Sequence, residues 1–124
     1  EHRVTIVGER VFASSLEDGL SERAHTDWRR DGQALAQRWR PSELPAPVKQ
    51  GLLRLMDRLG LNYGAADLLE TPDGRHVFLE CNPAGEFYWV ERAAGHAITR
   101  ALAEVLAGKA ARRRAVAPGG GFDA

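Results

Sequence analysis

The chain has 124 residues, of which 44% are apolar and 27% are charged, as in an ordinary soluble globular domain. Seventeen basic residues balance 17 acidic ones, so net charge favours neither nucleic acid nor a membrane surface as a partner. No apolar stretch approaches the roughly 20 residues that span a bilayer. The single cysteine, Cys81, excludes an internal disulfide and indicates a reducing, cytoplasmic environment.

The first residues predict a β-hairpin. Residues 3–7 (RVTIV) and 11–16 (VFASSL) are apolar and β-branched, and a short segment with a glycine separates them. The chain enters this pattern at once and has no initiating Met, which indicates a piece of a longer protein. Residues 17–34 are polar and lack periodicity, so we expect a long loop there.

Three prolines, Pro41, Pro45 and Pro47, predict a linker, and the third suits the first residue of a helix. Apolar residues then recur at helical spacing, and Gly60 is a natural C-terminal stop. The expected apolar face consists of Val48, Leu52, Leu53, Met56 and Leu59.

A turn signal at residues 71–74 (TPDG) separates residues 62–70 from residues 75–81 and predicts a second hairpin. Its second strand begins as an apolar run, residues 77–79, that we expect to be buried. A second amphipathic helix is expected over residues 93–107. The apolar face of that helix comprises Ile98, Leu102, Val105 and Leu106.

The pattern as a whole predicts an α+β domain, an antiparallel sheet of two hairpins covered by two amphipathic helices. We assign residues 1–107 to this domain. Residues 108–124 are rich in Gly, Ala and Arg and are expected to form a poorly ordered tail.

Polar side chains end the second hairpin. Glu80 and Asn82 are two residues apart, so they point to one face of their strand. If Asp73 and Gly74 form a two-residue turn, Asp67 lies directly opposite Glu80. A turn centred on Pro72 and Asp73 would put Asp67 opposite Phe78 but still on the face of Glu80. Opposed like charges destabilise a strand pair by roughly 0.2 to 1 kcal/mol, and a proton or a cation relieves the repulsion. Carboxylate and amide oxygens suit a hard cation, Mg2+ or Mn2+, although a solvent-facing polar strand would show the same spacing.

The run GLNYGAADLLETPDGRHVFLECNPAGEFYW resembles the C-terminal metal-binding hairpin of the ATP-grasp ligases. The likeness is greatest to the branch that matures graspetides, which are microviridin-type ribosomal peptides. In that branch a glycine and aromatic residues follow Glu-x-Asn-Pro, as Gly85, Phe87 and Trp89 do here. Upstream, HRVTIVGERVFASSL resembles a hairpin of the same family, and DWR (residues 27–29) resembles its central loop motif.

The resemblance implies the C-terminal portion of an ATP-grasp fold and ATP-dependent activation of a carboxylate as an acyl-phosphate. An amine or hydroxyl then displaces phosphate, on a precursor peptide in the graspetide branch. Asp67, Glu80 and Asn82 carry over as ligands of Mg2+, with Mn2+ as the alternative ion.

Other site residues also follow from the resemblance. Arg3 is placed near the nucleotide phosphates and the acyl-phosphate, and Arg29 is a candidate for holding the substrate carboxylate. Leu79 would pack on adenine beside Glu80 and Asn82. The competing interpretations are a solvated arginine at position 3, a solvated charge run around position 29 and an ordinary core leucine at position 79.

The family's other lobe, with its phosphate-binding lysines and Gly-rich lid, has no counterpart in this sequence, whose only lysines are Lys49 and Lys109. We therefore expect these residues to be inactive alone and to act within a longer ligase. ATP and a precursor peptide are the expected partners, and monomer or homodimer stays open. Two alternatives are a non-catalytic peptide-binding module and a glutamate ligase acting on another protein or amino acid.

Overall fold

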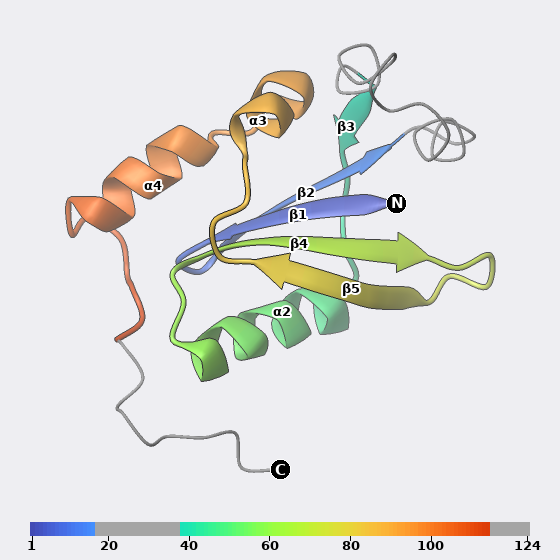
Figure 1. Ribbon diagram of the computed structural model, residues 1–124, viewed down its shortest axis with the longest axis horizontal. Helices are drawn as coiled ribbons and strands as arrows, with labels where there is room; N and C mark the ends of the chain where they lie inside the picture. Colours follow the sequence, from blue (N-terminus) through green and yellow to red (C-terminus); the bar gives the residue numbers. More distant parts are fainter. Residues whose placement is uncertain (17–37, 115–124) are drawn as a thin grey trace.

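The computed structural model describes residues 1–16 and 38–114. They form a five-stranded antiparallel sheet in the order β3-β2-β1-β4-β5. Helix α2 lies against one face of the sheet, and helices α3 and α4 lie against the other (Figure 1). The predicted α+β architecture is therefore confirmed. The expected loop over residues 17–34 and the end of the expected tail lie outside the described residues.

The first hairpin forms where the sequence predicts it. Strands β1 (His2–Val7) and β2 (Arg10–Leu16) pair antiparallel, with Val7 opposite Arg10. Gly8 sits in the turn with φ of 61°, a left-handed conformation that favours glycine. One side of β1 therefore remains free to pair with β4.

Strand β3 (Trp39–Pro41) includes Pro41, so the expected linker is wrong for this residue, and the sequence predicts no element for residues 39 and 40. It pairs with β2 and satisfies backbone groups along that edge of the sheet. Pro41 is tolerated because an edge strand does not require every N–H as a donor. Trp39 also contacts Trp89 edge to face, with ring centroids 5.6 Å apart.

Helix α2 (Ala46–Leu59) confirms the first predicted helix. It begins one residue before Pro47, and Gly60 ends it in the left-handed conformation with φ of 65°. Leu52 and Met56 are its buried residues, and they pack against apolar side chains of the sheet. The buried members of this cluster are Val4, Ile6, Ala13, Leu44, Leu52, Met56, Ala66 and Leu68.

The second hairpin joins β4 (Tyr63–Glu70) to β5 (His76–Asn82), and Asp67 lies directly opposite Glu80 as predicted. The two-residue turn is wrong, however, because Glu70 pairs with His76 and five residues connect the strands. A bulge corrects the offset: Leu68 pairs with Phe78, which leaves Leu79 as the extra residue in β5.

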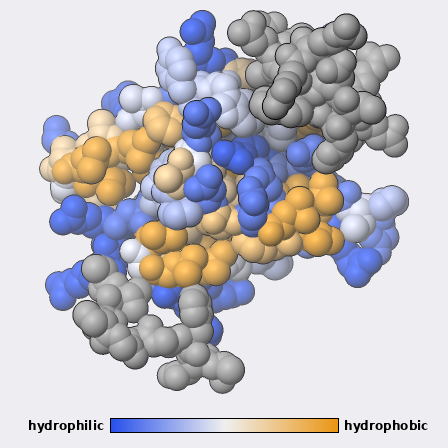
Figure 2. All heavy atoms as spheres, in the orientation of Figure 1, coloured by the Kyte–Doolittle hydropathy of each residue, from blue (hydrophilic) through white to orange (hydrophobic). Residues whose placement is uncertain are grey.

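The apolar run at the start of β5 is exposed, which corrects the expectation of a buried strand. Val77, Phe78 and Leu79 are 43%, 47% and 52% exposed. β5 is an edge strand, so no neighbouring strand lies beyond it in the described sheet. Apolar surface is visible over this side of the sheet in Figure 2.

The helix predicted over residues 93–107 is shorter than expected, and a separate helix, which the sequence does not predict, precedes it. α3 (Tyr88–Ala94) ends at Gly95, whose φ is 73°, and α4 (Ile98–Leu106) follows. Because the chain turns at Gly95, the two helices share one apolar cluster with β1. Its buried members are Val7, Val90, Ile98, Ala101 and Val105. Leu106, assigned to the buried face from periodicity, is 80% exposed.

Residues 108–114 continue the structure past α4. Arg113 donates hydrogen bonds to the carbonyls of Gly8 and Leu61 and to the Asp57 carboxylate. The Asn62 amide bonds the backbone of Arg113 in both directions. These contacts tie the first part of the expected tail to the rim of the sheet.

Within the described part of the chain, no helix has the length and apolar character needed to span a bilayer.

We expect Met56→Ala to lower the free energy of unfolding of the full-length protein by about 2 to 5 kcal/mol, because Met56 is fully buried and its loss leaves a cavity. Leu106→Ala is the matched control and should change it by about 0.5 kcal/mol or less. Urea unfolding of both variants measures the difference. Equal effects would contradict the assignment of the core to the α2 face.

Candidate functional site

Three charged side chains lie in one row across the sheet. Arg3 on β1 is directly opposite Asp67 on β4, which is directly opposite Glu80 on β5. Nη1 of Arg3 lies 3.1 Å from both oxygens of Asp67. These two side chains are 14% and 24% exposed, whereas Glu80 is exposed and has no side-chain partner within residues 1–16 and 38–114. The guanidinium thus offsets part of the carboxylate repulsion that the sequence predicts.

The row leaves one negative charge in excess, because one guanidinium faces two carboxylates. Asn82 lies two residues after Glu80 on the same face of β5. It is directly opposite Ala65, whose small side chain takes up little space on this face. The structure therefore brings together the three side chains predicted as metal ligands. Oδ1 of Asn82 accepts a hydrogen bond from the Ala84 N–H at 2.9 Å and keeps a second lone pair.

These donors fit a hard divalent cation. Glu80 and Asp67 supply carboxylate oxygens from adjacent strands, and Asn82 adds an amide oxygen. An oxygen-only set with a net negative charge is what Mg2+ prefers, and Mg2+ takes its remaining ligands from water and phosphate. The role of the three residues in holding such an ion remains a prediction.

The loop after β5 packs down on Arg3. Gly85 is buried, and a Cβ at this position would lie 2.5 Å from Cβ of Ala65 and 3.0 Å from Nη2 of Arg3. The Tyr63 hydroxyl donates a hydrogen bond to the Gly85 carbonyl, and burial raises the pKa of Tyr63, so the donor stays protonated. The Glu86 carbonyl accepts a hydrogen bond from Nη2 of Arg3 at 3.2 Å.

Arg3 is consequently held on several sides. Its guanidinium carbon lies 5.8 Å from the ring centroid of Trp89, and its Nε is buried without a hydrogen-bond partner among the described residues. A group fixed in this way orients Asp67. The pairing of Arg3 with Asp67 is absent from the sequence interpretation, because it requires the register between the two hairpins.

The structure decides the alternative for Leu79 and shows the contacts of the aromatic residues that follow β5. Leu79 is 52% exposed, so the interpretation as a core leucine is wrong. Phe87 packs on Tyr63, and Trp89 packs on Trp39, so these two aromatics form packing contacts. Arg29 lies outside the described residues.

Cys81 points to the α2 face and packs at the edge of its apolar cluster, away from Glu80. Burial raises the pKa of its thiol, which keeps the thiol protonated and a poor nucleophile. Packing, as expected from the alternation along β5, therefore accounts for this residue.

We expect Gly85→Ala to lower the free energy of unfolding by about 1 to 3 kcal/mol, because the added methyl collides with Ala65 and Arg3. Gly51→Ala is the matched control: it has nothing within 4 Å of the new methyl, lies inside α2 and should stabilise by about 0.5 to 1 kcal/mol. Thermal and urea unfolding test both. A neutral Gly85→Ala variant would contradict the close packing of the loop.

Comparison with known proteins shows which solved structures this chain resembles. No protein-family model matches the sequence, and no curated protein is significantly similar to it. Among solved structures, the chain is similar to a RiPP-associated ATP-grasp ligase from Chryseobacterium gregarium in complex with ADP and a leader and core peptide. The identity is 38% and the TM-score 0.82, over 91% of this chain and 34% of the ligase.

Two macrocyclases from Microcystis aeruginosa MRC are also similar. MdnC, bound with the precursor peptide MdnA, is 39% identical with a TM-score of 0.69, over 86% of this chain and 29% of MdnC. MdnB is 35% identical with a TM-score of 0.67, over 85% of this chain and 35% of MdnB. The chain spans about a third of the length of these proteins. The predicted resemblance to the graspetide-type ATP-grasp ligases is therefore confirmed, for a segment of about a third of such an enzyme.

Proposed function

We propose that this chain forms the Mg-ATP half-site of a longer ATP-grasp ligase that joins a side-chain carboxylate to an amine or a hydroxyl of a ribosomally made precursor peptide. The observation that carries the proposal is the row of Arg3, Asp67 and Glu80 on an open face of the sheet. The ADP and peptides bound to the similar ligase from Chryseobacterium gregarium support the choice of nucleotide and substrate class.

Asp67, Glu80 and Asn82 would hold Mg2+. When bound, the ion supplies positive charge to the phosphate oxygens of ATP and aligns them for transfer. Glu80 is exposed and unpaired among the described residues, so it offers its oxygens without breaking another contact. Asp67 keeps its orientation through Arg3, which leaves part of its carboxylate open on the face that Glu80 shares.

Arg3 acts in this proposal as a positioning residue. It is 14% exposed and bonded to Asp67 and to the Glu86 carbonyl, so its charge lies beside the proposed phosphate site but is already engaged. Leu79 is exposed at the bulge of β5 and offers an apolar surface for the adenine ring. Arg29 would hold the substrate carboxylate by a charge-assisted pair.

The proposed reaction has two steps. One oxygen of the substrate carboxylate attacks the γ-phosphorus of ATP, and the bond from that phosphorus to the bridging oxygen breaks to release ADP. The amine nitrogen or hydroxyl oxygen then attacks the acyl carbon and loses a proton, and inorganic phosphate leaves. Each catalytic turnover forms one amide or ester bond and removes the elements of one water molecule from the peptide.

We expect the double variant Asp67→Asn with Glu80→Gln, made in the full-length protein, to bind Mg-ATP at least about tenfold more weakly, a loss of roughly 1.4 kcal/mol or more. Both substitutions keep shape and remove charge, so they remove the attraction for the cation. Calorimetric titration of Mg-ATP measures the affinity. Mass spectrometry of the precursor peptide measures the loss of water from the product.

Glu43→Gln is the control, because its carboxylate side chain is 92% exposed and lies outside the site. It should leave both readouts unchanged. Unchanged Mg-ATP affinity and unchanged product in the double variant would overturn the proposed metal role. An unfolding curve for each variant separates a lost site from a lost fold.

A further inference from the structure

Two histidines and one glutamate converge at one end of the sheet. His2 lies on β1, Glu70 ends β4 and His76 begins β5. Nε2 of His2 is 3.0 Å from Oε2 of Glu70, and Nε2 of His76 is 3.9 Å from the same oxygen. One potential ligand atom from each residue lies within 4.8 Å of the other two.

The strand register produces this convergence. Glu70 is directly opposite His76, and His2 is directly opposite Leu68, two residues before Glu70 on the same face. Three adjacent strands therefore hold the three side chains. Glu70 is three residues from Asp67 along β4, so the cluster lies on the face opposite the proposed Mg2+ site.

The two imidazoles are largely fixed before any ligand arrives. The side chains of His2 and His76 are each 8% exposed, and their ring centroids lie 5.3 Å apart. Nδ1 of His2 lies 3.5 Å from the hydroxyl of Ser42, a contact that helps set the ring orientation. The cost of ordering these rings is thus met by folding and not by binding.

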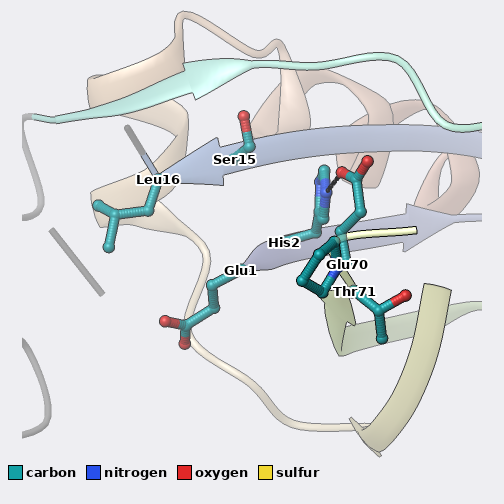
Figure 3. A pocket seen from close by; sticks show the side chains of 7 residues that line it. Glu1, His2, Ser15, Leu16, Glu70 and Thr71 are labelled. Carbon is teal, nitrogen blue, oxygen red and sulfur yellow. Dashed lines mark hydrogen bonds and ion pairs between the residues drawn. The ribbon is translucent and has the colours of Figure 1, made fainter. Parts of the chain in front are cut away.

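Glu70 faces the solvent side of the cluster. Its side chain is 48% exposed, and with His2 it lines a cavity of about 520 Å3 that also includes Ser15, Leu16 and Thr71. Figure 3 shows the His2 ring and the Glu70 carboxylate pointing toward each other beside this cavity. A ligand can therefore reach the carboxylate from outside while both rings stay in place.

We propose that His2, Glu70 and His76 form a binding site for a divalent transition-metal ion, with Zn2+ as the best-matched ion. Two imidazole nitrogens and one carboxylate oxygen are a donor set for Zn2+, whereas Mg2+ prefers oxygen alone. Ligands about 2.0 to 2.1 Å from a tetrahedral ion lie roughly 3.3 Å from one another. The separations of 3.0 and 3.9 Å from Glu70 bracket that value, and all three ligand atoms lie within 4.8 Å of one another.

The fourth position of such an ion would open toward the cavity and be filled by water or by a ligand atom. The three protein ligands come from β1, β4 and β5, so the ion would join the ends of these strands. Metal binding of this kind adds to the stability of the folded state, because the unfolded chain does not present the site.

The test uses the full-length protein and Zn2+ alone. Competition with a chromophoric chelator should reveal one saturable Zn2+ site. His76→Gln or Glu70→Gln should weaken Zn2+ binding by about 100-fold or more, because loss of a residue that only hydrogen-bonds to a metal ligand already lowers metal affinity about 10- to 100-fold. His96→Gln is the matched control: that ring bonds Ser14 and the Ala13 carbonyl elsewhere, and Zn2+ affinity should not change. Excess Mg2+ should not displace Zn2+.

Visible absorption of Co2+ gives a second readout, because a tetrahedral site has a strong spectrum that both ligand variants should abolish. Equal Zn2+ affinity in the wild type and His76→Gln, or no saturable binding in the wild type, would overturn the proposal. The Asp67→Asn, Glu80→Gln double variant should retain Zn2+ binding. Failure of this site and failure of the proposed Mg-ATP site are therefore distinguishable.

Discussion

The ion pair of Arg3 and Asp67 is the contact on which the functional face depends. It joins the two hairpins across the β1–β4 pairing at the middle of the sheet, where Arg3 lies directly opposite Asp67. Because Arg3 is paired with Asp67, Glu80 remains unpaired among the described residues, and this face of the sheet keeps one negative charge in excess. The pairing thus stabilises the sheet and leaves an attraction for a cation at the same place.

Packing is unequal on the two faces of the sheet. The α2 face is filled by apolar side chains along most of its length, whereas on the other face α3, α4 and the turn between them pack near Val7, Phe12 and Tyr63 and on Trp39 of β3. The loop at Gly85 closes the next part of that face, over Ala65 and Arg3. The carboxylates begin where this packing stops, so they stay accessible while their backbone is rigid.

Local patterns in the sequence predict the elements whose partners are close along the chain. Both hairpins and α2 follow from alternation, turn residues and helical spacing, and Asp67 opposite Glu80 follows from the hairpin. The predicted two-residue turn is wrong, but the pairing is still correct because the longer connection shifts the register by one residue and the bulge at Leu79 shifts it back. β3, the pairing of Arg3 with Asp67 and the break at Gly95 depend on contacts between distant segments, which periodicity along one element does not encode.

The same alternation that places Asp67 and Glu80 on one face places Glu70 and His76 on the other. The β4–β5 pair therefore presents an oxygen-only set to one side, and on the opposite side it forms a nitrogen-rich set together with His2 of β1. Donor chemistry separates the ions that each set prefers, since imidazole nitrogen favours a borderline metal and carboxylate with amide oxygen favours Mg2+. The bulge lies between the two sets, so β5 can keep Glu80 and His76 facing opposite ways although they are four residues apart. A regular strand would place both on one face, and the extra residue at Leu79 is what lets β5 contribute to the two proposed ligand sets on opposite faces of the sheet.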